Sequence, residues 1–222
     1  MVIEAFPPVS DADESGLLAV GGDLDPESLL LAYRSGIFPW PLHERQLAWF
    51  SPSERGVLFL KDFHISTSLK KVRNRPGWSF SFDERFAEVI TACAESAHRP
   101  GQSGTWITKK IISGYEEFHR AGFAHSVETY YEGELVGGLY GVAIGGFFAG
   151  ESMFFKKADA SKLALCHLVE HLVKVGVTWI DCQMVTPLLR SFGAQEISRD
   201  DYLKILQAAT GSSAIIFSRK GD

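Results

Sequence analysis

Three consecutive apolar runs with glycine-containing turns between them limit the fold of this chain more than any other feature. The runs cover residues 125–131, 134–143 and 147–154. The first turn is Glu132-Gly133 and the second is Gly145-Gly146. Two-residue turns of this kind connect antiparallel neighbours, because glycine readily adopts the positive φ that a tight hairpin requires. The runs are therefore predicted to form an antiparallel meander.

A helix and one more strand follow the meander. The helix is predicted from about Ala160 to Val175, and the strand ends at Asp181-Cys182-Gln183. Helices, a meander and a helix crossing to a further strand occur in this order in the GNAT acyltransferase fold, which is a resemblance at the level of fold. We therefore expect an α+β protein whose C-terminal part is GNAT-like and contains a mixed sheet.

The remaining elements are predicted from capping residues and from periodicity. The predicted helices are one opened by Asp25-Pro26-Glu27 and closed by Gly36, one capped by Asp83 and ending near Ser96, one from Thr108 to about Arg120, and one over about 200–209. The predicted strands are residues 57–60, a half-buried strand that carries Trp78, Phe80 and Phe82 on one face, and a last strand over residues 213–218.

Two polar side chains end the strand that follows the long helix. Side chains alternate along a strand, so Asp181 and Gln183 are predicted to point to the same side. Thr186 suits an N-cap and Pro187 the first helical position, so a helix begins almost at once. Sites in α/β proteins are often built at such strand ends. The alternative is that the two side chains only satisfy loop amides.

Composition and cysteine content exclude several classes of protein. Of the 222 residues, 45% are hydrophobic and 22% charged, which is ordinary for a folded, soluble chain. The first residues lack the pattern of a signal peptide, and the longest uncharged stretch is short for a membrane span and broken by glycines. Three scattered cysteines form no disulfide framework. We expect a reduced, cytoplasmic protein that does not enter the membrane.

A short basic segment contrasts with the net charge of −5. Lys70, Lys71, Arg73 and Arg75 lie within a predicted helix after Ser66. Such a run is usually a solvated helix face. The alternative is a local patch that binds phosphates on an otherwise acidic protein.

The sequence HLVEH, residues 167–171, matches a zinc-peptidase pattern. Helical periodicity places His167, Glu170 and His171 opposite the buried stripe of that helix, which favours surface residues over ligands. Serine-hydrolase and glycine-rich phosphate-binding motifs are absent from the sequence.

Several stretches together resemble the leucyl/phenylalanyl-tRNA–protein transferase family, from about Leu17 to Leu206. They are GGDLDPESLLLAYRSGIFPWP, WFSPSERGVL, GTWIT, AHSVETYYEGELVGGLYGVAIGGFFAGESMFF, ASKLAL and IDCQ with SFGA. The chain departs from the family pattern at Leu188, where a histidine is usual, and in the segments VETYY and GESMFF.

The resemblance implies both an architecture and an activity. A small N-terminal α/β domain, residues 1–62, would precede a GNAT-like catalytic domain, residues 63–222. The enzyme would move leucine or phenylalanine, and methionine less well, from aminoacyl-tRNA to a protein with N-terminal Arg or Lys. The product would be read by the ClpS adaptor and the Clp protease in the cytoplasm. The resemblance implies neither a cofactor nor a metal.

The resemblance also implies roles for individual residues. Asp181 and Gln183 would be catalytic; Glu151, Asp181 and Thr186 would bind the acceptor peptide; Leu139, Phe148, Met153, Leu168 and Ile180 would hold the aminoacyl side chain; Trp106, Lys70, Lys71 and Arg73 would bind the 3′ end of the tRNA. Taken singly, the apolar residues would simply be core, and Glu151 could instead be held by an internal hydrogen bond to backbone.

The chemistry agrees with these roles. The donor is an activated ester, so positioning an amine against its carbonyl suffices without ATP or a covalent intermediate. Gln183 could accept a hydrogen from the amine, and Asp181 could orient Gln183 or take the proton; the sequence leaves both open. The rival hypotheses are an acetyl-CoA N-acyltransferase, which would need a glycine-rich pyrophosphate loop before the long helix, and a non-catalytic reader of N-terminal Arg or Lys.

Overall fold

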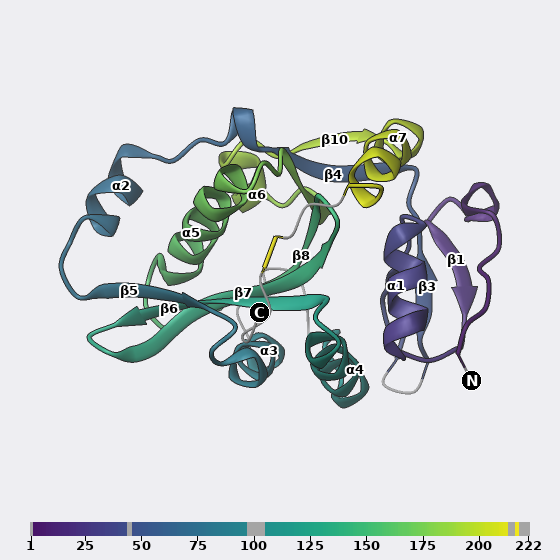
Figure 1. Ribbon diagram of the computed structural model, residues 1–222, viewed down its shortest axis with the longest axis horizontal. Coiled ribbons are helices and arrows are strands. Elements are labelled where there is room, and N and C mark those ends of the chain that lie inside the picture. The colour runs from purple at the N-terminus through teal and green to yellow at the C-terminus, as the bar shows by residue number, and fades with distance from the viewer. Residues whose placement is uncertain (1, 44–45, 97–104, 213–215, 218–222) are drawn as a thin grey trace.

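The computed structural model describes residues 2–43, 46–96, 105–212 and 216–217. Near the N-terminus, a small sheet with strand order β1-β3-β2 lies beside one helix, at the right of Figure 1. These elements are β1 (Leu17–Val20), α1 (Pro26–Arg34), β2 (Phe38–Pro39) and β3 (Ala48–Phe50), after a 3₁₀ turn at Val9–Asp11. The Asp25 carboxylate accepts from the Glu27 backbone N–H at 3.0 Å, so the predicted N-cap of α1 is confirmed.

The rest of the chain is built on a seven-stranded sheet with the order β10-β4-β9-β8-β7-β6-β5. Its strands are β4 (Glu54–Phe59), β5 (Trp78–Phe82), β6 (Ala124–Tyr131), β7 (Glu134–Ile144), β8 (Phe147–Phe155), β9 (Trp179–Gln183) and β10 (Gln195–Ser198). Strands β6 to β8 form the predicted meander, and β9 pairs parallel with β8 while the other pairs are antiparallel. The predicted α+β class, the mixed sheet and the GNAT-like order of elements are confirmed.

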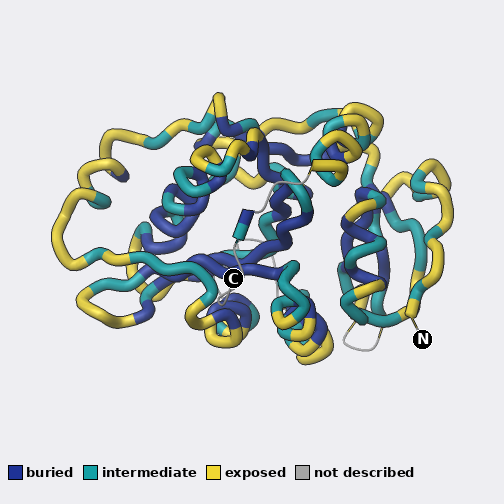
Figure 2. The backbone as a smooth tube through the Cα atoms, viewed as in Figure 1, coloured by how far each residue is buried: buried dark blue, intermediate teal, exposed yellow. Residues whose placement is uncertain are grey.

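Helices cover both faces of this sheet (Figure 1). They are α2 (Thr67–Arg73), α3 (Phe86–Glu95), α4 (Lys109–Arg120), α5 (Ala160–Lys174), α6 (Pro187–Ser191) and α7 (Arg199–Thr210), with a 3₁₀ turn at Leu60–Asp62. Helix α5 packs on β6, β7 and β8 from one side, whereas α3 and α4 pack from the other. Buried backbone is concentrated in the central strands and in the inner sides of α1 and α5 (Figure 2).

The two faces of the sheet carry separate apolar clusters, and a bulge in β8 decides which side chains join each. Tyr140 pairs with Ser152 and Gly141 with Gly150, so Glu151 is an extra residue without a partner in the ladder. A single extra residue inverts the alternation of side chains beyond it. As a result, Met153 lies on the α5 face together with Phe148, although they are five positions apart and strict alternation would place them on opposite faces.

The predicted cap at Asp83 is wrong. Helix α3 begins at Phe86, and its N-cap residue is Arg85. Asp83 has a positive φ of 57°, and its carboxylate contacts the His125 ring nitrogen at 2.7 Å and accepts from the Ser126 backbone N–H at 2.8 Å. The carboxylate is therefore bonded to β6 and does not cap the helix.

The predicted last strand, residues 213–218, falls mostly outside the described residues, and Ile216 and Phe217 form a bend. The domain boundary at residue 62 remains a prediction. Because β4 already belongs to the seven-stranded sheet, we propose that the division lies before Glu54.

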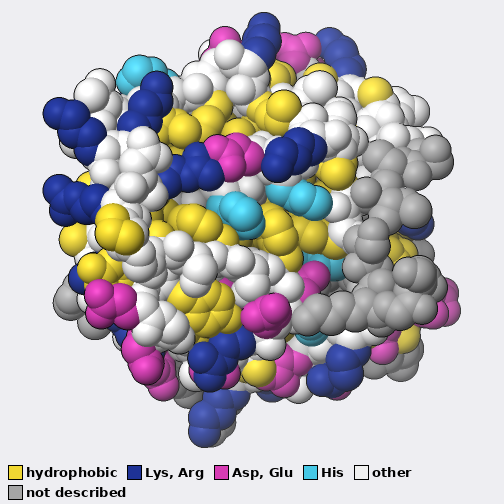
Figure 3. Space-filling model, turned by 60° about the vertical axis from the view of Figure 1, so that its left-hand side comes forward, with side chains coloured by type: hydrophobic (Ala, Val, Ile, Leu, Met, Phe, Trp, Pro, Cys, Tyr) yellow, Lys and Arg dark blue, Asp and Glu magenta, His cyan; other side chains and the backbone are white. Residues whose placement is uncertain are grey.

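The prediction that the histidines of HLVEH lie on a free surface of the helix is wrong. His167 stacks on Phe80 and Phe82 with ring centroids 4.9 and 4.7 Å apart, because β5 covers this side of α5. Figure 3 shows histidine side chains among hydrophobic ones at the centre of a face with Lys and Arg along its upper edge. Among the described residues, no three His, Cys, Asp or Glu side chains gather as they would around a metal ion.

Candidate active site

The candidate site lies where the parallel strands β8 and β9 stop pairing. Their register consists of Phe148 with Ile180 and Ala149 with Asp181. Just beyond these pairs, Glu151 occupies the bulge of β8 and Gln183 ends β9. The two polar side chains meet there, with Gln183 Nε2 and Glu151 Oε1 3.4 Å apart.

Gln183 has a strained backbone. Its φ is +53°, in the left-handed region that non-glycine residues adopt rarely and that often marks functional sites. Its backbone N–H donates to Asp181 Oδ1 at 2.9 Å, which helps to hold this conformation. On the neighbouring strand, a Cβ on Gly56 would lie 2.8 Å from the carbonyl carbon of Met184, so the turn after Gln183 requires a glycine at that position.

The Gln183 amide has an orientation that satisfies both of its polar atoms. Turned so, Nε2 donates to the carbonyl oxygens of Gly150 at 2.8 Å and Cys182 at 3.2 Å. The oxygen Oε1 then faces the Glu151 carboxyl as an acceptor. This is the arrangement in which the amide can accept a hydrogen from an incoming amine.

Asp181 is fully buried, and its carboxylate already accepts from four donors. Arg55 donates through Nε at 2.8 Å and Nη2 at 2.6 Å, Tyr202 through its hydroxyl at 2.9 Å, and Gln183 through its backbone N–H. Each oxygen receives two donors, which uses the usual acceptor capacity of a carboxylate. Of the two roles that the sequence left open, this geometry favours orientation of Gln183 over uptake of the proton by Asp181.

Sequence reasoning missed Arg55. Its side chain is 2% exposed, lies between the rings of Phe38 and Tyr202 at 4.6 and 4.5 Å, and donates to the Gly36 carbonyl at 3.2 Å. Burial alone would lower the pKa of this guanidinium, but Asp181 outweighs burial and raises it above the usual value. The available signal was an arginine inside an apolar strand, since a buried charge requires a partner.

Glu151 is held by two tyrosines that sequence reasoning also missed. The Tyr33 hydroxyl of α1 lies 2.7 Å from Oε1, the Tyr115 hydroxyl of α4 lies 3.2 Å from Oε2, and the two phenols also contact each other. Each phenol has one hydrogen to donate, so a phenol is the donor in at most two of these three contacts, and the third requires the hydrogen of a protonated Glu151 carboxyl. The partners of Glu151 are thus side chains and not the backbone groups that the sequence offered as the alternative. Burial raises the pKa of Glu151 to about 7, although the two phenols act in the opposite direction.

The residues predicted to hold the aminoacyl side chain lie together between the sheet and α5. Four of them are buried, namely Leu139, Phe148, Leu168 and Ile180, and Met153 packs partly buried against the same cluster. Gly141 makes room for Phe148, since a Cβ there would lie 2.5 Å from the Phe148 ring and 2.2 Å from the Ala149 carbonyl oxygen. The set predicted from resemblance is therefore contiguous in space.

The remaining predicted residues lie away from this centre. Thr186 is exposed, and its hydroxyl caps α6 by accepting from the Leu189 backbone N–H at 3.2 Å. Trp106 stacks on Trp40, with centroids 4.8 Å apart and an interplanar angle of 18°. Close in sequence to these two rings, Pro41 and Thr108 line a groove of about 630 Å³ beside α4.

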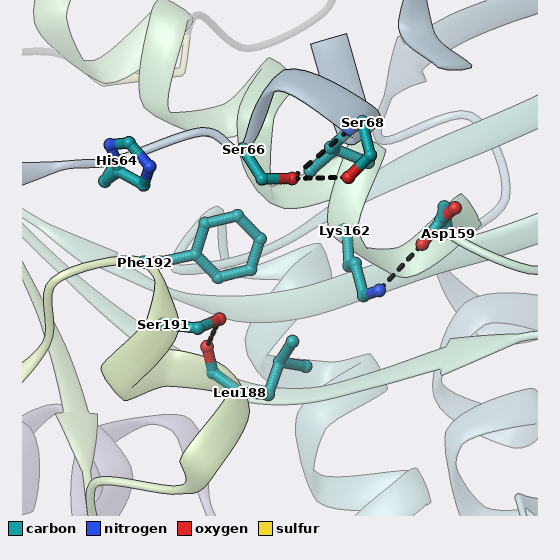
Figure 4. Close-up of a pocket in the computed structure, with 9 residues that line it drawn as sticks. His64, Ser66, Ser68, Asp159, Lys162, Leu188, Ser191 and Phe192 are labelled. Carbon is teal, nitrogen blue, oxygen red and sulfur yellow. Dashed lines mark hydrogen bonds and ion pairs between the residues drawn. The ribbon is translucent and has the colours of Figure 1, made fainter. Parts of the chain in front are cut away.

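Lys70, Lys71 and Arg73 of the basic segment lie in α2, which begins after Ser66 as predicted, whereas Arg75 lies beyond its end. Lys70 and Lys71 are exposed, whereas Arg73 forms a two-pronged ion pair with Glu170 of α5. Next to α2, a pocket of about 140 Å³ is lined by residues that include Ser66 and Lys162 (Figure 4). In this pocket Ser66 is hydrogen-bonded to Ser68, and Lys162 pairs with Asp159 at 2.7 Å.

The strand order, with an amide and a carboxyl where β8 and β9 separate, defines the class of the protein as an α+β protein with a mixed sheet and a polar site at the end of its parallel strand pair. The family described as leucyl/phenylalanyl-tRNA protein transferase matches residues 57–207, and the N-terminal domain of the same family matches residues 22–53. The chain therefore belongs to the leucyl/phenylalanyl-tRNA protein transferase family.

Relatives named leucyl/phenylalanyl-tRNA–protein transferase align with nearly the whole chain. The protein from Syntrophobacter fumaroxidans is 53% identical over 201 residues, which cover 90% of this chain and 86% of the relative. The protein from Dechloromonas aromatica is 51% identical over 214 residues, which cover 96% and 91%.

Among solved structures, FemX is similar with a TM-score of 0.49 and 10% identity, covering 82% of this chain and 71% of that one. L-PGS from Bacillus licheniformis is similar with a TM-score of 0.43 and 18% identity, covering 72% and 52%. In the described part of the chain, none of the helices is both long and apolar enough to cross a membrane.

Proposed function

We propose that this aminoacyltransferase moves leucine or phenylalanine, and methionine less well, from tRNA to proteins that begin with Arg or Lys. Aminoacyl transfer from tRNA to protein is the activity of the family to which the chain belongs. The observation that carries the proposal is that Gln183 and Glu151 meet where β8 and β9 separate, next to an enclosed apolar cluster. In that arrangement Gln183 can contact the amine of the acceptor, Glu151 its cationic side chain, and the apolar cluster the side chain of the donor.

In the proposed reaction the neutral α-amino group of the acceptor attacks the ester carbonyl carbon of the aminoacyl-tRNA. A C–N bond forms, the C–O bond to the tRNA 3′ end breaks, and the tRNA leaves with a free hydroxyl. Gln183 Oε1 accepts a hydrogen bond from the attacking amine, and the proton that the amine loses passes to the leaving 3′ oxygen, directly or through a water molecule. An α-amino group has an ordinary pKa of about 7.7–8.0, so modest assistance suffices near neutral pH. Asp181, fixed by Arg55, orients Gln183.

Glu151 is proposed to bind the cationic side chain of the acceptor. Its own hydrogen-bonding partners, Tyr33, Tyr115 and the Gln183 amide, are neutral, whereas Asp181 is already paired with Arg55. An incoming guanidinium or ammonium would therefore find its partner in Glu151. Thr186, at the start of α6, is proposed to contact the acceptor backbone at the rim of the site.

The donor is proposed to bind by its side chain and by its tRNA end. The residues proposed to surround that side chain are apolar and uncharged, so selection of Leu and Phe rests on shape; they are Leu139, Phe148, Met153, Leu168 and Ile180. For the tRNA, Trp106 offers a ring near the groove beside α4, where a base could stack. Lys70 and Lys71 are proposed to contact phosphates more strongly than Arg73, because Arg73 is bonded to Glu170.

The proposed product carries a new N-terminal Leu or Phe. We propose that it is recognised by the ClpS adaptor and degraded by the Clp protease, and that the reaction takes place in the cytoplasm.

The test is transfer of labelled leucine from leucyl-tRNA to a peptide that begins with Arg. Peptides that begin with Ala or with N-acetylated Arg are the matched controls, because each removes one recognised group. We expect label only in the Arg or Lys peptide, with free leucine inert. Transfer from acetyl-CoA instead, or tight binding of the Arg peptide without any transfer, would favour the two rival functions.

A further inference from the structure

Ile216 and Phe217 lie in the layer between the sheet and α5, beyond the region 57–207 that the family description matches. Ile216 is 4% exposed, and its carbonyl oxygen is 2.7 Å from the Nε2 of His171 on α5. The short segment is therefore attached to α5 by a polar contact as well as by burial. In Figure 1 it is the isolated yellow piece near the centre.

The ring of Phe217 spans the distance from the sheet to α5. It stacks on His125 of β6 at 4.2 Å and 21°, and on His171 at 5.0 Å and 22°. It also contacts Phe82 at 5.5 Å and Phe148 at 6.2 Å, measured between ring centroids. Phe217 thus joins the two surfaces that enclose the apolar cluster.

The register of the sheet places this ring at one end of the donor site proposed above. His125 lies opposite Gly141, and Gly141 lies opposite Gly150, so two of these three neighbouring positions lack a side chain. Two residues further along β6 and β7, Val127 lies opposite Leu139, and Leu139 lies opposite Met153 of β8. On α5, His171 lies one turn beyond Leu168. Phe217 therefore stands beside Phe148, next to the row that carries Leu139 and Met153.

We propose that Phe217 is a specificity-determining residue whose ring forms the end wall of the site for the donor side chain. The inference rests on the proposed donor site and adds a residue to it from outside the matched region. Because the wall is an aromatic ring, its size limits how long a donor side chain can be. Leucine and phenylalanine would fit, and the bicyclic ring of tryptophan would collide with Phe217.

The test compares Leu, Phe and Trp on the same tRNA body with the wild type, Phe217→Ala and Phe217→Trp. A misfit of about one methyl group changes kcat/KM by roughly 10–200-fold, so removal of the ring should raise the Trp-to-Leu ratio of kcat/KM at least about tenfold. Phe217→Trp should lower the use of Phe more than that of Leu. The matched control is Phe123→Ala, which removes a partly buried ring packed on Phe118 at 5.2 Å in the other apolar cluster.

Each result of this comparison supports or contradicts the proposal that Phe217 forms the end wall of the donor site. A change of the donor ratio in the Phe217 variants, with the Phe123→Ala ratio unchanged, supports it. An equal fall for all donors would show that Phe217 only stabilises the fold, and an equal rise would show that it obstructs the site. If the wild type transferred no leucine at all, the proposed function would fail first, independently of Phe217. Thermal unfolding of each variant shows whether it is folded. If Phe217→Ala does not fold, Phe217→Trp alone still tests the proposal.

Discussion

Replacement of Arg55 by methionine is the most direct test of how the site is built. The change keeps most of the side-chain volume but removes the guanidinium, which supplies two of the four donors to Asp181. Asp181 has no exposed surface, so water cannot easily replace the lost donors. The carboxylate is left buried and only partly compensated by Tyr202 and the Gln183 backbone.

The expected loss follows from this burial. Removing one partner of a buried ion pair lowers the free energy of unfolding by about 3–5 kcal/mol. For a chain of this size each kcal/mol corresponds to about 2–4 °C in Tm, so Tm should fall by roughly 6–20 °C. Arg55→Lys keeps the charge without the two-pronged geometry and should lose less.

The assay combines urea unfolding, followed by circular dichroism, with the rate of transfer from leucyl-tRNA. The matched control is Arg85→Met, because Arg85 forms an exposed pair with Glu88 at 2.6 Å, and solvent screening leaves such a pair little effect on stability. A double variant, Arg55→Met with Asp181→Asn, removes both charges and should recover part of the stability lost in Arg55→Met alone.

Activity should fall together with stability, because Asp181 holds the backbone of Gln183. At a temperature where Arg55→Met is still folded, kcat should decrease more than the KM for either substrate changes. If the free energy of unfolding of Arg55→Met were within about 1 kcal/mol of the wild-type value and its kcat were unchanged, the ion pair would neither stabilise the fold nor position Gln183.

Four further predictions concern single features of the site. Gln183→Ala should lower kcat by about 10²–10⁴-fold with an unchanged circular dichroism spectrum, and a wild-type rate would show that the amide only ends the strand. Burial raises the pKa of Glu151 to about 7 from an ordinary 4.5, so the folded chain keeps a proton that the unfolded chain releases between these values. The free energy of unfolding should therefore decrease as pH rises from about 4.5 to 7, by up to about 3 kcal/mol, and Glu151→Gln should abolish that slope in denaturation series across this range. The double variant Lys70→Ala, Lys71→Ala should raise the KM for charged tRNA. It should also reduce the slope of log affinity for tRNA against log salt concentration, by up to about one for each lost phosphate contact. An equal effect with an aminoacyl-adenosine donor would contradict a tRNA contact. Met153→Ala should weaken the use of Leu and narrow the gap between Leu and Ile in kcat/KM, whereas equal use of both by the wild type would mean that the donor side chain is read elsewhere.

The elements that the sequence predicted well depend on interactions between near neighbours. The meander follows from alternating apolar residues and glycine turns at Gly133 and Gly145, both of which have positive φ. Helix α6 begins where Thr186 and Pro187 indicated, because capping involves residues only three apart. The position of Asp181 and Gln183 at the end of a strand was predictable for the same reason, whereas the apolar set was indicated only by the family resemblance.

Tertiary structure alone decided which partners the polar groups found. Arg55 meets Asp181 across 126 positions of sequence, and Tyr33 meets Glu151 across 118, so local periodicity carried no signal of either contact. The bulge at Glu151 depends on the register between β7 and β8, and it moves Met153 to the face of Phe148, which strict alternation would have excluded. Side-chain alternation and capping act over a few residues and are written in the local sequence, whereas a buried charge is satisfied by whichever donor the packed sheet brings within about 3 Å.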